Sequence, residues 1–212
     1  MSFDALADLL DRAGRGLSPT PPEPDDPISN PRGDHDLDPV GIALRPGKPH
    51  RPAAVLVPVF VRDSELSVLF TVRASHLRDH SGQIAFPGGK IEPDDRSPAD
   101  AALREAEEEI GLRATDIRIL GYLDAYLSAT GFLVMPVVGL CDADARLELD
   151  PGEVEEVFEV PLARLMDPVR RRLGVGVWQD RPRRYYAIPF GERMIWGVTA
   201  GIVNNLHERL FP

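Results

Sequence analysis

Runs of apolar residues bounded by polar turns divide the chain from about residue 50 onward. Short runs rich in β-branched and aromatic residues are typical of strands. Six segments have this pattern: residues 53–61, 66–72, 117–127, 131–140, 153–162 and 183–190. The last two are the weaker candidates. No regular strand–helix–strand alternation is visible. The pattern therefore favours strands packed with helices over a parallel, doubly wound sheet.

Three other stretches have apolar residues at helical spacing. The N-terminal one repeats through Phe3, Leu6, Leu10 and Ala13. The other two cover residues 98–110 and part of 194–210. Because amphipathic surface helices usually cover their own core, we expect the first helix to pack on its own domain, and a homodimer contact is the alternative. The predicted fold class is α+β, a mixed twisted sheet sandwiched between helices.

Proline sets the N-terminal part of the chain apart. Ten of the 21 prolines lie between Pro19 and Pro52, in an acidic stretch almost free of large apolar residues. Such a stretch cannot bury enough surface to offset the entropy of ordering it. We therefore predict an N-terminal helix with a proline-rich extension over residues 1–45, and one functional domain over residues 46–212.

Composition and charge exclude several classes of protein. The chain has 212 residues with 43% hydrophobic and 27% charged residues, which is typical of a globular protein. Its net charge of -10 disfavours a general binder of nucleic acids or anionic membranes. Cys141 is the only cysteine, so an intrachain disulfide and a cysteine-based zinc site are excluded. No apolar run approaches the roughly 20 residues that span a bilayer, and no secretory signal is evident. We predict a cytoplasmic protein.

A helix with well-marked ends is predicted over residues 98–110. Ser97 is a good N-cap residue, Pro98 occupies the first helical position, and Gly111 ends the helix. The stripe expected to face the core contains Ala99, Leu103, Ala106 and Ile110.

A neighbouring stripe of the same helix is acidic. Glu105, Glu108 and Glu109 follow i, i+3, i+4 spacing, which places three carboxylates side by side. Mg²⁺ or Mn²⁺ would relieve their repulsion, because these ions prefer oxygen ligands. Arg104 precedes Glu108 by four residues and is placed to orient it, whereas Glu107 points elsewhere. The alternative is a solvated acidic face with one arginine pair.

A glycine loop precedes the acidic helix. Residues 86–90 read FPGGK, directly after a short apolar segment. Gly88 and Gly89 let the chain turn sharply and bring the backbone close to a helix or a ligand. A sharp loop that leads into an acidic helix is typical of phosphate chemistry, in which a metal neutralises phosphoryl oxygens and polarises a water.

The stretch from residue 88 to 112 resembles the Nudix box. That signature is a glycine, five residues, an acid, seven residues, then Arg-Glu, an apolar residue, any residue, Glu-Glu, any residue, Gly and an apolar residue. The second half matches in full, through Arg104, Glu105, Ala106, Glu108, Glu109, Gly111 and Leu112. In the first half, Asp95 stands where glutamate is usual, and eight residues separate it from Arg104. The role of Asp95 is therefore left open.

Residues 69–89 resemble the additional motif of the coenzyme A pyrophosphatase subgroup of Nudix hydrolases. The matching positions are Thr71, Arg73, Ala74, Arg78, Gly82 and residues 86–89. Residues 153–168 and 194–206 also look like this subgroup. Arg73 and Arg78 stand just before the glycine loop, and arginine suits bidentate phosphate contacts. His76 and His80 lack metal-ligand spacing and are interpreted as ordinary surface residues.

The resemblance implies a metal-dependent hydrolase of coenzyme A or its thioesters. The implied products are 4′-phosphopantetheine, or its acyl form, and adenosine 3′,5′-bisphosphate. The implied metal ligands for Mg²⁺ or Mn²⁺ are Glu105, Glu108 and Glu109, which form the catalytic set with Arg104. The implied substrate-binding residues are Arg73, Arg78, Gly88 and Gly89.

Some questions stay open at this point. The general base is either a box glutamate or a member of the cluster Glu153, Glu155 and Glu156, although a polar strand edge is the favoured interpretation of that cluster. One alternative function is hydrolysis of ADP-ribose, a dinucleotide or an oxidised nucleotide. The other is a non-catalytic nucleotide-binding module, which the retained box glutamates disfavour.

Overall fold

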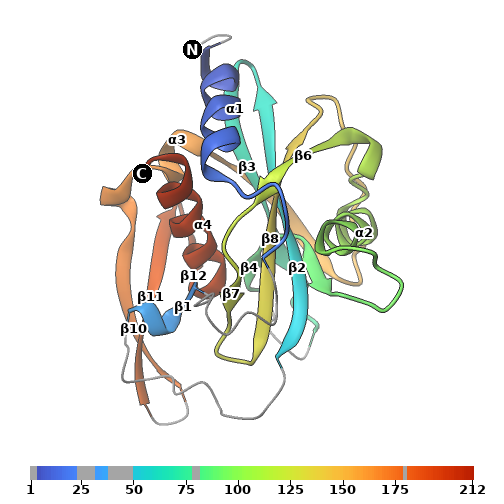
Figure 1. Ribbon diagram of the computed structural model, residues 1–212. Helices are drawn as coiled ribbons and strands as arrows, with labels where there is room; N and C mark the ends of the chain where they lie inside the picture. Colours follow the sequence, from blue (N-terminus) through green and yellow to red (C-terminus); the bar gives the residue numbers. More distant parts are fainter. Residues whose placement is uncertain (1–3, 23–31, 38–49, 78–81, 179–180) are drawn as a thin grey trace.

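The computed structural model describes residues 4–22, 32–37, 50–77, 82–178 and 181–212 (Figure 1). Its helices in these ranges are α1 (Asp4–Gly16), α2 (Pro98–Ile110), α3 (Leu162–Leu165) and α4 (Gly197–Leu210), with short 3-10 turns η1 (Asp34–Asp36), η2 (Ala114–Asp116) and η3 (Pro168–Arg170). None of the helices in the described part of the chain is long and apolar enough to cross a membrane.

The described strands form two sheets. The large sheet contains β1 (Arg32–Gly33), β2 (Arg51–Arg62), β3 (Glu65–Arg73), β4 (Ile84–Ala85), β5 (Gly88–Lys90), β6 (Ile117–Tyr122), β7 (Tyr126–Leu127), β8 (Phe132–Cys141) and β9 (Val154–Pro161). The small sheet contains β10 (Arg172–Trp178), β11 (Arg181–Phe190) and β12 (Arg193–Trp196).

The large sheet is mixed. Its main path runs β1-β7-β8-β2-β3-β4, with β5 paired to β2, β6 to β8 and β9 to β3. The central strands β2 and β8 are parallel, whereas β3 is antiparallel to β2, β4 and β9. Helices α2 and α4 cover opposite faces of this sheet (Figure 1). The predicted α+β sandwich is confirmed.

Strand β2 explains why the apolar run near residue 55 is unbroken. Leu56 and Phe60 pack with α2, whereas Val57 and Val59 pack in the cluster that contains α4. Successive side chains of a strand point to opposite faces, so a strand buried on both faces is apolar throughout. The core is therefore two layers, one on each side of the sheet.

Helix α1 lies against α4, β3 and β6 of its own chain. Its buried residues are Leu9 and Ala13, and Leu17 follows them into the core. The predicted stripe is thus partly wrong, because Leu6 and Leu10 are only half-buried and Phe3 lies outside the described residues. The packing agrees with a helix that covers its own domain. The division at residue 45 also lies outside the described ranges and stays a prediction.

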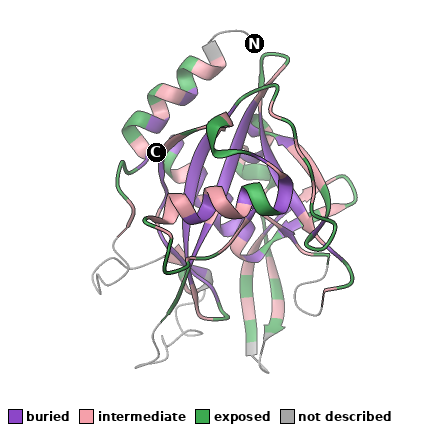
Figure 2. Cartoon of the chain, turned by 90° about the vertical axis from the view of Figure 1, so that its right-hand side faces the viewer, coloured by how far each residue is buried: buried purple, intermediate pink, exposed green. Residues whose placement is uncertain are grey.

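The small sheet contains strands that the hydrophobic pattern did not predict. In β10, glycines alternate with exposed Leu173, Val175 and Val177, so the burial that normally marks a strand is missing. Residues 193–196 form β12, and the C-terminal helix begins only at Gly197. Figure 2 shows two largely exposed strands extending beyond the body of the molecule, in contrast to the buried strands of the large sheet.

Candidate active site

Helix α2 begins and ends as its sequence predicts. Ser97 Oγ accepts a hydrogen bond from the Asp100 backbone N–H at 3.1 Å, and Gly111 has the left-handed φ of 68° that ends a helix. The buried face differs from the prediction, however: it contains Ala101, Ala102, Ala106, Glu109 and Ile110. Ala99 and Leu103 are only half-buried. Small alanines on several faces specify the rotation of a helix weakly, so the spacing alone misplaced the stripe.

The acidic side chain of Glu109 is part of that buried face. Only 6% of Glu109 is exposed, and its Oε2 accepts a hydrogen bond from the Gly88 N–H at 3.3 Å. Gly88 has a φ of 155°, and a Cβ there would overlap the backbone of β2. A Cβ at Gly89 would overlap the Glu105 carboxylate. Gly88 is therefore needed for the close pairing of β5 with β2, and Gly89 leaves room for the Glu105 carboxylate. Contact of either glycine with substrate stays a prediction.

Negative charge accumulates at this point of the fold. Burial raises the pKa of Glu109 to about 8, helped by the nearby charges of Glu105 and Glu153 and opposed by the Gly88 N–H and Arg73. Burial also raises the pKa of Glu105, and the hydrogen bond from Arg104 opposes this shift. The ionised carboxylates are thus less stable here than in water, and a cation would stabilise them.

Arg104 connects the helix to the preceding loop. Its Nε and Nη2 donate to the two carboxylate oxygens of Asp95 at 3.2 and 3.1 Å, and Nη2 also donates to the Lys90 carbonyl at 3.1 Å. Its Nη1 donates to Glu105 and Glu108, each at 3.0 Å. The hydrogen bond from Arg104 lowers the pKa of Asp95. Asp95 therefore acts as the bidentate partner of Arg104, in spite of the longer loop.

The donor set suits a hard divalent cation. Carboxylate oxygens are the ligands that Mg²⁺ and Mn²⁺ prefer, and burial raises the pKa values of Glu105 and Glu109, so a bound cation would stabilise their ionised forms. Within the described residues, however, no group of three or more His, Cys, Asp or Glu side chains is already arranged to hold a metal ion. Instead, Nη1 of Arg104 donates a hydrogen bond to Glu105 and another to Glu108.

Two residues from outside the helix act on the same carboxylates. Arg73 is the last residue of β3, at a register shift against β9, and its charge lowers the pKa of Glu109. Glu153 immediately precedes β9, and its carbonyl accepts the Ala74 N–H at 2.9 Å. The charge of Glu153 raises the pKa of both Glu105 and Glu109. Pairing of β3 with β9 brings these residues to the site.

The three acidic residues at the start of β9, Glu153, Glu155 and Glu156, have different contacts. Glu155 accepts the Ser75 N–H at 3.0 Å, and Glu156 pairs with Arg193 of β12, as the strand-edge interpretation expects. The charge of Glu153 also reaches Glu105 and Glu109, a coupling that the strand-edge interpretation did not include. His76 is exposed, as predicted. The remaining predicted residues, Arg78 and His80, lie outside the described ranges.

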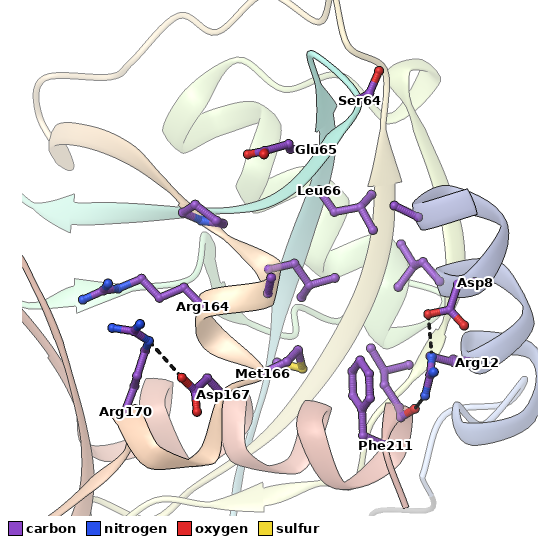
Figure 3. Close-up of a pocket in the computed structure, with 16 residues that line it drawn as sticks. Asp8, Arg12, Ser64, Glu65, Leu66, Arg164, Met166, Asp167, Arg170 and Phe211 are labelled. Carbon is purple, nitrogen blue, oxygen red and sulfur yellow. Dashed lines mark hydrogen bonds and ion pairs between the residues drawn. The ribbon is translucent and has the colours of Figure 1, made fainter. Parts of the chain in front are cut away.

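A cavity of about 760 Å³ lies elsewhere, between α1, α3, the start of β3 and the end of α4 (Figure 3). Four of the charged residues that line it form two ion pairs: Arg12 with Asp8 at 2.7 Å and Arg170 with Asp167 at 3.0 Å. Strand β3 begins at this cavity and ends at Arg73, so about 27 Å of strand separates the cavity from the carboxylates. The cavity is not part of the carboxylate site.

The NUDIX domain model matches residues 49–176. The chain belongs to the Nudix family. Two curated relatives, both named "Uncharacterized Nudix hydrolase NudL", come from Escherichia coli (strain K12) and Escherichia fergusonii. Each is 40% identical over 165 residues, which cover 74% of this chain and 81% of the relative. Helix α2 and its glycine loop are accordingly the Nudix box, and Nudix hydrolases generally depend on divalent metals.

Solved structures with a similar chain path include the following two. The NUDIX domain of Shewanella oneidensis NrtR, complexed with ADP ribose, has a TM-score of 0.49 at 18% identity and covers 80% of this chain and 94% of its own. A Caenorhabditis elegans Ap4A hydrolase binary complex has a TM-score of 0.46 at 18% identity, covering 52% of this chain and 80% of its own.

Proposed function

We propose that this Nudix hydrolase cleaves the diphosphate bond of coenzyme A or its thioesters. The products are 4′-phosphopantetheine, or its acyl form, and adenosine 3′,5′-bisphosphate. The observation that carries the proposal is the position of Arg73. This residue belongs to the subgroup motif, and its positive charge lowers the pKa of Glu109. A guanidinium beside the box carboxylates is suited to a diphosphate, which an acidic surface alone would repel.

The box supplies the residues for a divalent cation. Glu105, Glu108 and Glu109 are the ligands that we propose for Mg²⁺ or Mn²⁺. When bound, such an ion neutralises diphosphate oxygens and lowers the pKa of a water molecule. The chain prepares this site through Gly88, whose N–H holds Glu109, and through Arg104, which orients Glu105 and Glu108.

Proton removal from the attacking water needs a carboxylate near the box. Glu153 is exposed, and its charge acts on Glu105 and Glu109, so it joins the box glutamates as a candidate general base. Glu155 and Glu156 are weaker candidates, because neither contributes to the pKa shifts of Glu105 and Glu109 as Glu153 does, and Glu156 pairs with Arg193 of β12.

The decisive experiment is a substrate panel assayed with Mg²⁺ and with Mn²⁺. It contains coenzyme A, an acyl-coenzyme A, dephospho-coenzyme A, ADP-ribose, a dinucleotide and an oxidised nucleoside triphosphate. We expect coenzyme A or its thioester to have the highest kcat/KM. A higher kcat/KM for ADP-ribose or the dinucleotide would replace the proposed substrate, and tight binding without any cleavage would favour a non-catalytic module.

Arg73 gives a second test of the same proposal. Because Arg73 acts on Glu109, we expect it to contact the scissile diphosphate rather than the 3′-phosphate. Arg73→Ala should then lower kcat/KM for coenzyme A and dephospho-coenzyme A equally, by roughly ten- to a hundredfold for a lost charge-assisted contact. A loss confined to coenzyme A would instead assign Arg73 to the 3′-phosphate. The role of Arg78 stays a prediction.

A further inference from the structure

The small sheet has an uncovered face that carries aromatic residues. Ile188 and Ile195 are buried in the core cluster that contains α4, so the side chains that alternate with them point away from α4. On this outward face Trp196 is 43% exposed and Met194 is 45% exposed. The rings of Trp196 and Tyr185 lie 5.5 Å apart and are inclined by 59°. We call this surface the outward face.

Small residues leave room for these rings. Gly174 is paired in register with Tyr185, and a Cβ at Gly174 would overlap the tyrosine ring. Ala187 is paired with Trp196 on the next strand. Tyr185 therefore lies directly over β10, and no large side chain stands between it and Trp196. The result is an aromatic surface of the kind on which a nucleobase stacks.

The outward face also carries positive charge. Arg183 is paired in register with Gly176 and shares the orientation of Tyr185, two residues along β11. Its Nε and Nη1 are buried and have no hydrogen-bond partner within the described part of the chain. Two buried N–H donors without an acceptor are unfavourable in this half-buried side chain, and an anionic ligand that accepts from them would relieve the cost. Arg172, exposed on the same face, adds a second cation in a chain of net charge -10.

Contacts place the small sheet beside the end of the large sheet at which Arg73 lies. Strand β12 lies against β4, and Thr199 Oγ1 donates to the Ile84 carbonyl at 3.1 Å. Strand β4 pairs with the end of β3, one residue before Arg73. Strand β12 belongs to the other sheet, so its contact with β4 joins the two sheets close to the end of β3. Arg193, on the side of β12 opposite to Trp196, pairs with Glu156, three residues after Glu153.

We propose that the outward face binds the nucleotide half of the substrate. The base stacks on Trp196 and Tyr185, and Arg183 pairs with a phosphate distant from the bond that is cleaved. The identification of that group as the 3′-phosphate of coenzyme A rests on the proposed function. Aromatic rings, an unsatisfied guanidinium and proximity to β4 together select an anionic ligand with a flat base.

Binding to the full-length protein tests the proposal without requiring turnover. The probes are adenosine 3′,5′-bisphosphate and adenosine 5′-monophosphate, titrated by calorimetry. Trp196→Ala should weaken both, by roughly five- to a hundredfold. Arg183→Ala should weaken the bisphosphate by about ten- to a hundredfold and the monophosphate little. With substrates, Arg183→Ala should raise the KM for coenzyme A much more than the KM for dephospho-coenzyme A.

Matched variants separate recognition from folding. Arg184 is adjacent to Arg183 but faces the opposite side of β11, so Arg184→Ala should behave as wild type. Val175→Ala is the corresponding control for loss of an exposed apolar side chain. Trp196→Phe keeps a stacking ring and should retain most of the affinity. Thermal unfolding of each variant identifies any that fail to fold.

The possible results have distinct meanings. Equal losses for Arg183→Ala and Arg184→Ala, or unchanged bisphosphate affinity in Trp196→Ala, would overturn the proposal. If wild type cleaves coenzyme A while the outward-face variants match it, the nucleotide site is wrong and the proposed function stands. If wild type cleaves no coenzyme A but binds the bisphosphate through Trp196, the nucleotide site stands and the substrate assignment is wrong.

Discussion

The Nudix box and the cavity between α1 and α3 both contain charged side chains, but the two regions differ in how those charges are paired and buried. At the cavity rim, Arg12 pairs with Asp8 and Arg170 with Asp167. On α2, Glu105 and Glu109 are shielded from water beside further acids, and their pKa values rise. The pairs at the cavity rim compensate each other's charge, whereas the carboxylates of Glu105 and Glu109 stay less stable than in water in spite of Arg104 and Arg73.

This difference shows why volume alone is a poor guide to chemistry. A ligand gains affinity from groups that are less stable without it than with it. Buried carboxylates with raised pKa values meet that condition, and paired charges at an open rim do not. The following predictions test the contrast, from the largest expected effect to the smallest.

Removal of one box charge should have the largest effect. Glu109→Gln keeps the shape of the side chain but removes its charge, so kcat/KM should fall by about a hundredfold or more, since a catalytic metal contributes several kcal/mol. Glu108→Gln should behave similarly. Glu107→Gln on the exposed side of α2 is the matched control and should stay near wild type. Near-normal turnover of Glu109→Gln with intact folding would refute the assigned role.

Stability of the metal-free protein should depend on pH through Glu109. Its pKa is about 8 in the folded chain against a usual value of 4.5, so the folded state holds a proton that the unfolded state has lost. The free energy of unfolding should therefore fall between pH 5 and pH 8, by a few kcal/mol at most, on the order of 1.36 kcal/mol per unit. The pKa of Asp95 is lowered, so this group titrates below the window.

Urea unfolding in a chelator at several pH values measures this effect. Glu109→Gln should make the curve less steep, because it keeps a neutral side chain at every pH, and Glu105, whose pKa is also raised, accounts for the slope that remains. Added Mg²⁺ should recover stability at pH 8.5 in wild type but much less in the variant. A wild-type curve that is already flat between pH 5 and pH 8 would contradict the prediction.

The link between Asp95 and Arg104 should have an intermediate effect. Asp95→Ala removes both carboxylate acceptors of the Arg104 fork, so Arg104 should orient Glu105 and Glu108 less well. Loss of such a supporting contact typically costs roughly ten- to a hundredfold in activity or metal affinity. Asp94→Ala, one residue earlier and exposed, is the control. Equal activities of the two variants would leave Asp95 with a role in the loop alone.

Changes at the cavity should have the smallest effect. Arg170→Ala breaks the pair with Asp167, and such exposed pairs contribute about 0–1 kcal/mol to stability. We expect kcat/KM within about twofold of wild type and a small shift in Tm. A tenfold loss of kcat/KM would show that the cavity is coupled to the box, and the contrast between the two regions would fail.

Local sequence chemistry was sufficient for the elements that carry the box. The N-cap Ser97 and the stop at Gly111 depend on neighbouring residues only, and both lie where predicted. The unbroken apolar run of β2 likewise predicts a strand that is buried on both faces, and successive side chains of β2 do pack in the two different clusters. The mixed sheet between helices follows from these local patterns, because each element must bury its apolar side against another.

The elements that the sequence did not reveal depend on distant partners. Strand β10 pairs with β11 although its outer side chains are exposed, so its hydrophobic pattern carries little information about pairing. The buried face of α2 includes Glu109 because the glycine loop offers it an N–H. No periodicity rule would place a glutamate there, since an isolated buried carboxylate is unfavourable.

The sequence by itself determined the chemistry available to this protein: a glycine loop, an acidic helix with clear ends, and an arginine motif just upstream. Only the tertiary structure decided how these groups act on one another. Pairing of β3 with β9 brings Arg73 and Glu153 to the box, and the loop joins Asp95 to Arg104. Residue types and spacings are local properties, whereas burial and electrostatic coupling depend on which distant segments pack together.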